Sequence, residues 1–324
     1  MSLDFSGVMP ATITPFTETG EVDHKALARL GRWLSEVPGV TGLVCNGHAG
    51  EGTSLSHQER AEVVETLKSA VVGNVAVISG VIDEGTDLAA REAAAAEKAG
   101  ADGILVYPPH GWLRFGFQRP APVDRYRTIS ETVSIPQILF LYPDATKATY
   151  DVSTIVDICQ NANVVAIKNG VRNMARWDQE VPFLRSKLPG IKILTCQDEY
   201  LLHTMWDSDG SIIGYGCLIP ELMVQLQESA HAEKYREARE IYDRIGPLTK
   251  VIYHRDNHLE GTIALKVGLV LRGVLDSAAV RSPLFPLPKG ELVEIAQALS
   301  FAGVSVRQDV LSDSLENVNV ESDK

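Results

Sequence analysis

The chain has 324 residues, a length that suits one α/β barrel, and its 45% apolar content is too high for a disordered protein. Its formal charge of −12 argues against nucleic acids and anionic membranes as partners. The negative charge does not exclude a small anionic ligand, because a local site can be positive within a negative protein.

Eight short apolar runs, each expected to be a buried strand, alternate with longer helical patterns. In chain order, the expected strands are Val8–Thr14, Gly42–Asn46, Val75–Val81, Gly103–Tyr107, Gln137–Tyr142, Val164–Lys168, Ile191–Cys196 and Ser211–Tyr215. Their apolar residues are continuous rather than alternating, as in parallel strands that are buried on both faces. Between them, His57–Val71 and the alanine-rich Leu88–Ala99 have the pattern of helices.

This alternation of strands and helices predicts βαβ units with right-handed crossovers. Eight strands predict a closed (β/α)8 TIM barrel. An open doubly wound sheet is the structural alternative, but no G-x-G-x-x-G sequence follows the first strand to favour it.

Beyond the eighth strand the pattern becomes purely helical. We expect helices at Glu221–Ile245, Gly261–Leu275 and Lys289–Ala302. We assign residues 1–225 to the barrel and 226–310 to a C-terminal helical extension packed on it. The polar and acidic residues 311–324 are expected to form a flexible tail.

The cysteines and the N-terminus bear on the cellular compartment. Cys45, Cys159, Cys196 and Cys217 form no C-x-x-C pair, so neither a zinc ribbon nor a redox motif is visible. The first ten residues lack a basic segment, and no window approaches the roughly 18 apolar residues of a membrane span. We expect reduced thiols, no signal peptide, no membrane partner and a cytoplasmic protein.

Lys168 is the sharpest candidate for chemistry, because active residues of a barrel gather at the carboxyl ends of its strands. It closes the apolar run Val164–Lys168, where burial disfavours the ammonium form and lowers the pKa of the amine. A neutral amine can attack a ketone and form an iminium, an electron sink for making or breaking carbon–carbon bonds. On spacing alone, a lysine that reaches out to water is an equally good interpretation.

Other strand ends offer further candidates. Tyr142 ends the fifth strand near Lys168, and its phenol can pass protons, although, taken alone, a tyrosine packed on the barrel rim explains it better. The glycine-rich loop after the second strand, residues 47–52, can direct backbone N–H groups at a carboxylate. By itself that signal is weak, because loops after barrel strands often carry glycine. Thr14, His110 and Gly214 also lie at strand ends.

Several motifs in one order resemble the dihydrodipicolinate synthase / N-acetylneuraminate lyase family. They are Gly7-Val-x-x-Ala-x-x-Thr14-Pro15-Phe16, Gly47-x-x-Gly50-Glu51-x-x-Ser54-Leu55-Ser56-x-x-Glu59-Arg60, Tyr142-Pro143, Val165-Ala-Ile-Lys168, Gly210-Ser-Ile-Ile-Gly214 and Arg281-Ser-Pro283-Leu284. The resemblance covers residues 5–300. The order and spacing of the set make it more specific than any one motif.

The resemblance implies a (β/α)8 barrel with C-terminal helices, assembled as a homo-oligomer (tetramer or dimer), with no metal or organic cofactor. Lys168 takes the position of the lysine that forms a Schiff base with pyruvate or another 2-oxo acid, and Tyr142 that of the proton shuttle. The backbone of Ala49 and Gly50 takes the position that grips the substrate carboxylate. We place Thr14 and Gly214, by their strand ends, in the same substrate site.

Departures from the family pattern concern the proton relay and the second substrate. His48 replaces the threonine that relays protons, and Ala49 lacks the next threonine's hydroxyl. His110 stands where synthases carry a tyrosine that reaches the neighbouring subunit's site. Lys147 stands roughly where they carry an arginine for a dicarboxylic partner. We therefore expect an aldolase or a 2-oxo-3-deoxy sugar acid dehydratase, with His48 and His110 as acid–base residues, rather than a true dihydrodipicolinate synthase.

Two other classes of function stay open. A metal-dependent barrel lyase needs carboxylates and histidines together at strand ends, where the sixth strand offers Lys168 instead. A non-catalytic ligand-binding barrel explains the altered loop, but not the presence of both Lys168 and Tyr142. His254 and His258 have the spacing of a helical metal pair, but surface or interhelical contacts explain them better.

Aromatic residues cluster after the fourth strand. Trp112, Phe115 and Phe117 fall within six residues of one another. They could wall a substrate pocket, but packing within the loop or at a subunit interface is at least as good an interpretation.

Overall fold

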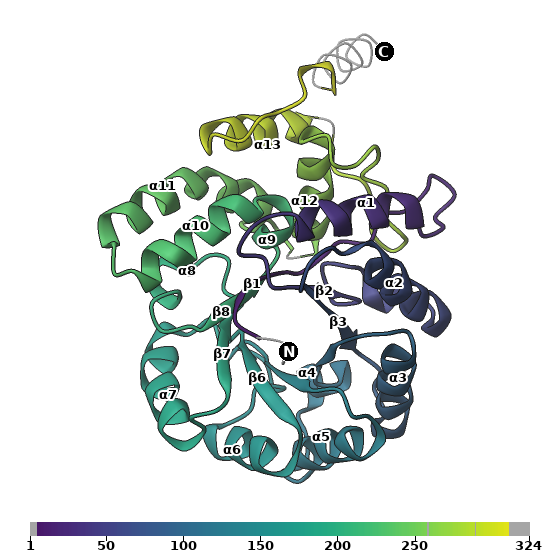
Figure 1. Ribbon diagram of the computed structural model, residues 1–324, viewed down its shortest axis with the longest axis vertical. Helices are drawn as coiled ribbons and strands as arrows, with labels where there is room; N and C mark the ends of the chain where they lie inside the picture. Colours follow the sequence, from purple (N-terminus) through teal and green to yellow (C-terminus); the bar gives the residue numbers. More distant parts are fainter. Residues whose placement is uncertain (1–4, 258, 289, 311–324) are drawn as a thin grey trace.

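Eight parallel strands form a barrel in the computed structural model of the chain, which describes residues 5–257, 259–288 and 290–310 (Figure 1). The strands are β1 (Gly7–Pro10), β2 (Gly42–Cys45), β3 (Ala76–Val81), β4 (Gly103–Val106), β5 (Gln137–Leu141), β6 (Val164–Asn169), β7 (Lys192–Thr195) and β8 (Gly210–Ile213). They pair in the order β1-β8-β7-β6-β5-β4-β3-β2. Parallel bridges from Val8 to Val40 and from Ala11 to Val44 join the β1 and β2 segments. The predicted (β/α)8 fold is confirmed.

All eight predicted strands are present, but several end earlier than the apolar runs do. The predicted strand Val8–Thr14 is wrong beyond Pro10. There the backbone N–H and the hydroxyl of Thr12 both donate to the Val44 carbonyl, at 2.9 and 3.2 Å. The Thr14 hydroxyl donates to the Gly50 carbonyl at 2.7 Å. These bonds take the segment out of the sheet and tie it to the loop after β2.

Helices cover the outside of the barrel. The outer layer consists of α1 (His24–Ser35), α2 (His57–Ala70), α3 (Thr86–Lys98), α5 (Ala121–Thr132), α6 (Val152–Asn161) and α7 (Met174–Lys187). Short turns lie between them as η1 (Gly52–Ser54), α4 (His110–Phe115), α8 (Leu201–Thr204) and α9 (Tyr215–Leu218). The two helices predicted after the second and third strands are confirmed as α2 and α3. A capping box fixes the start of α2, because Ser56 and Glu59 each accept the other's backbone N–H.

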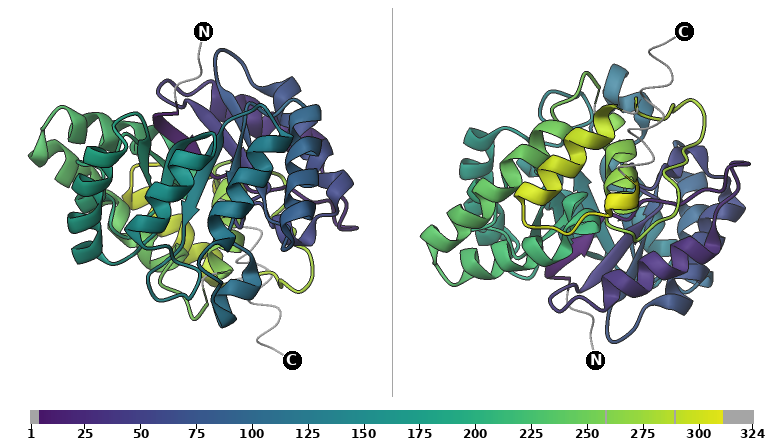
Figure 2. Two further views of the ribbon diagram at one scale, coloured as in Figure 1. Left: turned by 90° about the horizontal axis from the view of Figure 1, so that it is seen from below. Right: turned by 90° about the horizontal axis from the view of Figure 1, so that it is seen from above.

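After α9 the chain forms α10 (Pro220–His231), which packs on β1 as the last outer helix of the barrel, and then α11 (Tyr235–Ile252), α12 (Glu260–Leu271) and α13 (Gly290–Phe301) of the C-terminal extension. The single helix predicted over Glu221–Ile245 is wrong, because the helix is interrupted between α10 and α11, where Glu233 takes a left-handed φ of 57°. The other two predicted helices are confirmed as α12 and α13. These helices gather on the side of the barrel that carries β1 and α1 (Figures 1 and 2). The predicted tail, residues 311–324, lies outside the described residues.

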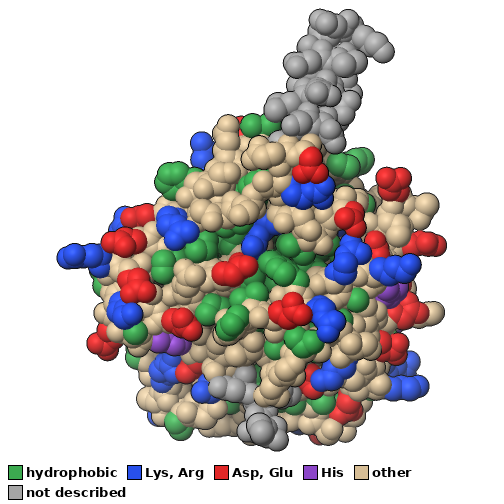
Figure 3. Space-filling model, turned by 45° about the horizontal axis from the view of Figure 1, so that its top comes forward, with side chains coloured by type: hydrophobic (Ala, Val, Ile, Leu, Met, Phe, Trp, Pro, Cys, Tyr) green, Lys and Arg blue, Asp and Glu red, His purple; other side chains and the backbone are tan. Residues whose placement is uncertain are grey.

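The side chains on the two faces of the strands pack into two separate apolar clusters, which explains why the apolar residues along each strand are consecutive. Along β5 and just beyond it, Ile138, Phe140 and Tyr142 pack inside the barrel. Leu139 and Leu141 pack on the other face, under the helices. Alternate residues therefore serve the barrel interior and the helix layer. Charged side chains of both signs are interspersed over the face drawn in Figure 3, and no described helix is long and apolar enough to cross a membrane.

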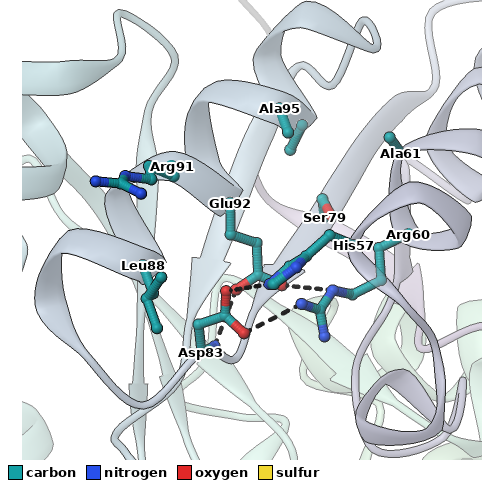
Figure 4. A pocket seen from close by; sticks show the side chains of 10 residues that line it. His57, Arg60, Ala61, Ser79, Asp83, Leu88, Arg91, Glu92 and Ala95 are labelled. Atoms are coloured by element: carbon teal, nitrogen blue, oxygen red, sulfur yellow. Dashed lines mark hydrogen bonds and ion pairs between the residues drawn. The ribbon is translucent and has the colours of Figure 1, made fainter.

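A buried ion network holds α2 and α3 against the segment that follows β3 (Figure 4). Arg60 contacts Glu92 at 2.9 Å and Asp83 at 3.1 Å, and His57 contacts Asp83 at 2.6 Å. One oxygen of Glu92 also accepts the backbone N–H groups of Ile82 and Asp83. Burial raises the pKa of Glu92, although Arg60 opposes that rise. A cavity beside this network is lined largely by apolar atoms of the two helices and contains no lysine or cysteine.

Replacing Glu92 by alanine should lower the free energy of unfolding by about 2–3 kcal/mol, because Arg60 loses one of its two carboxylate partners and keeps only Asp83, and two backbone N–H groups lose their acceptor. Urea denaturation measures the change. The control is Glu131→Ala, which removes an exposed ion pair with Arg127 and should change the free energy by at most about 0.5 kcal/mol. Equal losses in the two variants would show that the network does not stabilise the fold.

Candidate active site

A cavity of about 500 Å3 opens at the carboxyl ends of the strands. Six of the residues predicted for the site line it: His48, Ala49, Gly50, His110, Lys168 and Gly214. Its other lining residues include Thr12, Tyr107, Phe140, Arg172, Cys196, Asp198 and Tyr253. The predicted site residues from the second, fourth, sixth and eighth strands thus meet around one space.

Lys168 lies near the end of β6 with only 8% of its surface exposed. Burial lowers the pKa of its amine, and the neighbouring Asp198 opposes that change. The ammonium nitrogen lies 4.1 Å from the centre of the Phe140 ring, a residue that the sequence analysis did not single out. A lysine in such surroundings can be a neutral nucleophile at moderate pH. The interpretation of Lys168 as a side chain that reaches out to water is therefore wrong.

Tyr142 and His48 form a hydrogen-bonded pair above Phe140. The Tyr142 hydroxyl lies 3.0 Å from His48 Nε2, and their rings meet edge to face at 5.8 Å. Burial raises the pKa of Tyr142 well above its usual value, so the phenol keeps its proton. A neutral phenol bonded to an imidazole can exchange protons with a substrate through that ring.

His110 lies 5.8 Å from His48, ring centre to ring centre, within the same chain. It begins the short helix α4, where both its own N–H and that of Gly111 donate to the Glu84 carboxylate. The His110 ring nitrogen Nδ1 also lies 3.3 Å from Glu84. Glu84 thus fixes the place of His110 at the cavity.

The loop after β2 is closed by its own backbone. The N–H of Gly52 donates to the Gly47 carbonyl at 3.0 Å, and a side chain on Gly52 would lie 2.1 Å from the Asn46 carbonyl oxygen. Only glycine therefore fits at position 52. Within the described residues, the N–H groups of Ala49 and Gly50 donate no hydrogen bond. They are the donors of this loop that can bind a carboxylate.

A buried ion pair holds this loop from outside the barrel. Lys266 of α12, fully buried, lies 2.5 Å from Glu51, which takes a left-handed φ of 51°. Lys266 also donates to the Ala279 carbonyl at 2.8 Å, and the second oxygen of Glu51 accepts the Arg281 N–H at 3.0 Å. The ring of Phe16 lies beneath both cations, 4.4 Å from Lys266 and 4.6 Å from Arg281. The sequence analysis missed this clamp, because its two ends are far apart in the chain.

The opposite wall of the cavity carries charged residues that the sequence analysis also missed. Asp198 follows β7, and burial raises its pKa to about 6, although the Tyr215 N–H donates to it at 3.1 Å. Arg172, four residues after Lys168, lies 3.4 Å from Glu199. The rule that found Lys168, a polar residue at a strand end, could have found Asp198. Tyr253 comes from the extension and gives no such signal.

Some predicted residues do not line the cavity, and Tyr142 is one of them: it lies behind the lining residues Phe140 and His48, which it contacts. Thr14 is buried beneath the loop, bonded to the Gly50 carbonyl, and does not line the cavity. Lys147 is exposed and is also absent from the lining. Gly214 does line it, and a side chain there would lie 2.1 Å from the Tyr253 hydroxyl.

The aromatic residues predicted to cluster after the fourth strand do not all pack together, and one of the two paired histidines is outside the described residues. The ring centres of Trp112 and Phe117 lie 5.0 Å apart, whereas Phe115 is 76% exposed. His258 lies outside the described residues. Among the residues that are described, no three His, Cys, Asp or Glu side chains are grouped to hold a metal ion.

Comparison with known proteins gives one consistent result. Residues 4–302 match the Dihydrodipicolinate synthetase family. The 4-hydroxy-tetrahydrodipicolinate synthase of Natronomonas pharaonis is 30% identical over 298 residues, which are 91% of this chain and 97% of that one. The chloride-inhibited dihydrodipicolinate synthase of Acinetobacter baumannii, solved with pyruvate, has 25% identity and a TM-score of 0.81 over 93% of this chain and 100% of its own. A monomeric dihydrodipicolinate synthase variant has 26% identity and a TM-score of 0.84, and the match covers 94% of this chain and 98% of the variant.

Replacing Lys266 by methionine should lower the free energy of unfolding by about 3–5 kcal/mol, because the Glu51 carboxylate then stays buried without its cation. Urea denaturation measures the loss. The double variant Lys266→Met with Glu51→Gln should recover part of it, since no buried charge is left unpaired.

The control for the clamp is Arg239→Met, which breaks an exposed pair with Asp243 and should cost at most about 0.5 kcal/mol. A double variant no more stable than Lys266→Met would show that the unpaired charge is not what destabilises the single one.

Proposed function

Because the chain belongs to the dihydrodipicolinate synthetase family, a family of class I aldolase-type lyases, we propose that it forms an imine between Lys168 and the keto group of pyruvate or another 2-oxo acid. The family forms its Schiff base on a lysine and needs no cofactor. The observation that carries the proposal is the buried amine of Lys168 at the cavity floor, with its lowered pKa.

Imine formation starts from the neutral amine. The lone pair of Lys168 Nζ attacks the keto carbon, and the resulting carbinolamine loses water to give the iminium. The Tyr142 hydroxyl supplies the proton that leaves with this water, and His48, hydrogen-bonded to Tyr142, takes part in the return of the proton. The N–H groups of Ala49 and Gly50 hold the carboxylate of the acid, so that its keto carbon faces the amine.

The next step decides the reaction. Loss of a C3 proton from the iminium gives an enamine, which attacks an aldehyde in a condensation; the reverse sequence cleaves the carbon–carbon bond. Loss of a C4 hydroxyl from the enamine of a 3-deoxy sugar acid is instead a dehydration. His110, held beside His48 by Glu84, is placed to serve either step as a second acid or base.

The expectation that true synthase activity is excluded finds no support, since the relatives compared above are named as synthases. Condensation of pyruvate with an amino acid semialdehyde therefore stands beside aldol cleavage and dehydration. One observation counts against this condensation. Lys147, at roughly the position where synthases carry an arginine for a dicarboxylic partner, is exposed and does not line the cavity. A ligand-binding barrel without turnover is the second candidate, favoured by the replaced threonines at His48 and Ala49.

Assembly and location belong to the same proposal. We place the protein in the cytoplasm as a homo-oligomer that binds a small 2-oxo acid. The monomeric variant among the compared structures shows that this fold also exists as a single subunit. His110 lines the cavity of its own chain, so its acid–base role does not require a neighbour.

Incubation with pyruvate and sodium borohydride should give a reduced pyruvyl adduct on Lys168, mapped by peptide mass spectrometry. Lys168→Ala should abolish the adduct, and Lys147→Ala, an exposed lysine beyond β5, should leave it unchanged. Because burial lowers the pKa of Lys168 below its ordinary 10.5, the trapping rate should reach half its maximum at a pH below that value. If pyruvate, 2-oxobutyrate and a 2-oxo-3-deoxy acid all fail to label Lys168, the Schiff-base function is wrong.

Tyr142→Phe should reduce the rate of imine formation by about 10²- to 10⁴-fold, because the site loses the hydroxyl that moves the proton. His48→Asn should weaken the same relay while leaving the phenol in place. Stopped trapping at timed intervals measures the rate of imine formation. Tyr126→Phe is the matched control, since its buried hydroxyl bonds to the Val106 carbonyl away from the cavity. Wild-type rates in Tyr142→Phe would remove Tyr142 from the mechanism.

A further inference from the structure

Phe140 lies directly against the reacting nitrogen. Phe140 of β5 and Lys168 of β6 are register partners in the parallel sheet, and both side chains face the cavity. The nitrogen of Lys168 lies 4.1 Å from the centre of the Phe140 ring. The phenyl ring is 7% exposed and belongs to the cluster inside the barrel. The ring carries no group that can form a hydrogen bond.

The neighbours of Phe140 fix the orientation of its ring. The Tyr107 ring packs edge to face against it, with 5.0 Å between ring centres and an interplanar angle of 89°. The Tyr142 ring packs in the same way, with 4.7 Å between ring centres and an interplanar angle of 68°. Gly170 leaves the space that the ring occupies, because a side chain there would lie 3.2 Å from Phe140 Cε2 and 2.8 Å from the Cys196 sulfur. The ring therefore keeps its face toward Lys168 without a change of rotamer when charge develops there.

The face of an aromatic ring carries negative potential and attracts a cation within about 6 Å, most strongly where water is excluded. Burial by itself disfavours positive charge on Lys168. Yet imine formation, whichever 2-oxo acid is used, places positive charge on this nitrogen. The site therefore needs a group that favours the cation and does not compete for its protons.

Resting on the imine chemistry proposed above, we propose that Phe140 is a catalytic residue that stabilises the positively charged nitrogen of Lys168, as ammonium and as iminium, through the face of its ring. The bonds made and broken stay those of imine formation: Nζ–C2 forms, and the C2 hydroxyl leaves as water. Because the phenyl ring cannot exchange a proton, proton transfer is left to the Tyr142–His48 pair. The ring also favours the iminium over the neutral enamine, so the covalent intermediate accumulates in the charged form.

The other charged and titratable groups around Lys168 come from neighbouring elements and stay unchanged when Phe140 is replaced. Cys196 and Asp198 follow β7 and raise the pKa of Lys168, whereas Arg172, after β6, lowers it. Tyr107 and Tyr142 are neutral, since burial raises the pKa of each. A change in the titration of Lys168 on replacing Phe140 therefore reports the ring.

The first experiment titrates Lys168 without any 2-oxo acid. The protein is labelled with 13C-formaldehyde and cyanoborohydride over a pH series, and labelling at Lys168 is read from its peptide by mass spectrometry. Since the neutral amine reacts, the midpoint of labelling follows the pKa of Lys168. Phe140→Leu and Phe140→Met should lower this midpoint by about 0.5–1 pH unit, which is roughly a 3- to 10-fold change in the ratio of ammonium to amine. Phe140→Tyr retains the ring and should keep the wild-type midpoint.

The second experiment measures the fraction of protein trapped as an imine with pyruvate and borohydride, at a pH above the labelling midpoints of all variants, where Lys168 is neutral before it reacts. Under that condition only the iminium is charged, so Phe140→Leu and Phe140→Met should lower the trapped fraction by about 3- to 10-fold, and Phe140→Tyr should preserve it. Ile138→Val, on the same inner face of β5, controls for loss of packing and should leave both the midpoint and the trapped fraction unchanged.

Two results overturn the role of Phe140. One is a wild-type midpoint in both variants that lack the ring. The other is a shift in Phe140→Tyr or Ile138→Val as large as theirs, which would mark a packing effect. If the wild-type protein traps none of the 2-oxo acids, the proposed function fails, while the titration without substrate still decides whether the ring stabilises the charged nitrogen. The two failures are therefore distinguishable.

Discussion

The buried ion pair between Lys266 and Glu51 is the interaction on which the site depends, because it ties the helical extension to the loop that follows β2. Two charges withdrawn from water are tolerated only when they are paired and when further hydrogen bonds satisfy the rest of each group, as the Ala279 carbonyl and the Arg281 N–H do here. The loop between Gly47 and Glu51 has little regular structure of its own. Its position relative to the barrel is therefore set by a helix outside the barrel.

Low polarity inside the barrel then sets the chemistry of the two groups that react. The same burial lowers the pKa of Lys168 and raises that of Tyr142, and in both cases it favours the neutral form. In the proposed mechanism the neutral amine is the nucleophile and the neutral phenol is the proton donor, so one environment prepares both. On that proposal the apolar residues that stabilise the core, Phe140 among them, also surround the reaction.

Much of the fold could be predicted from the sequence, because continuous apolar runs and helical periodicity are local signals, and the eight strands follow from them. The strand-end positions of Lys168 and Tyr142 follow from the same signals, but the roles predicted for them and for His48 rest on the resemblance to the family. Strand ends were harder, since the bonds of Thr12 and Thr14 across to the next loop are tertiary. Phe140 was missed because an aromatic residue within an apolar strand gives the same pattern whether it packs a core or faces a reacting nitrogen. Residues supplied by the extension were missed because no periodicity links them to a strand end.

The long sequence separation between Glu51 and Lys266 also affects the order in which the parts of the site are synthesised. The two residues are 215 positions apart, and all eight strands precede Lys266 in the chain. A polypeptide emerging from the ribosome can therefore assemble its barrel, and bring Lys168 into it, before Lys266, which pairs with Glu51 of the loop after β2, has been made. The pair with Glu51 can form only after all eight strands have been synthesised. A chain cut short before α12 would keep the buried Lys168 but would lack the cation that pairs with Glu51, so the loop after β2 would lose its tie to the extension.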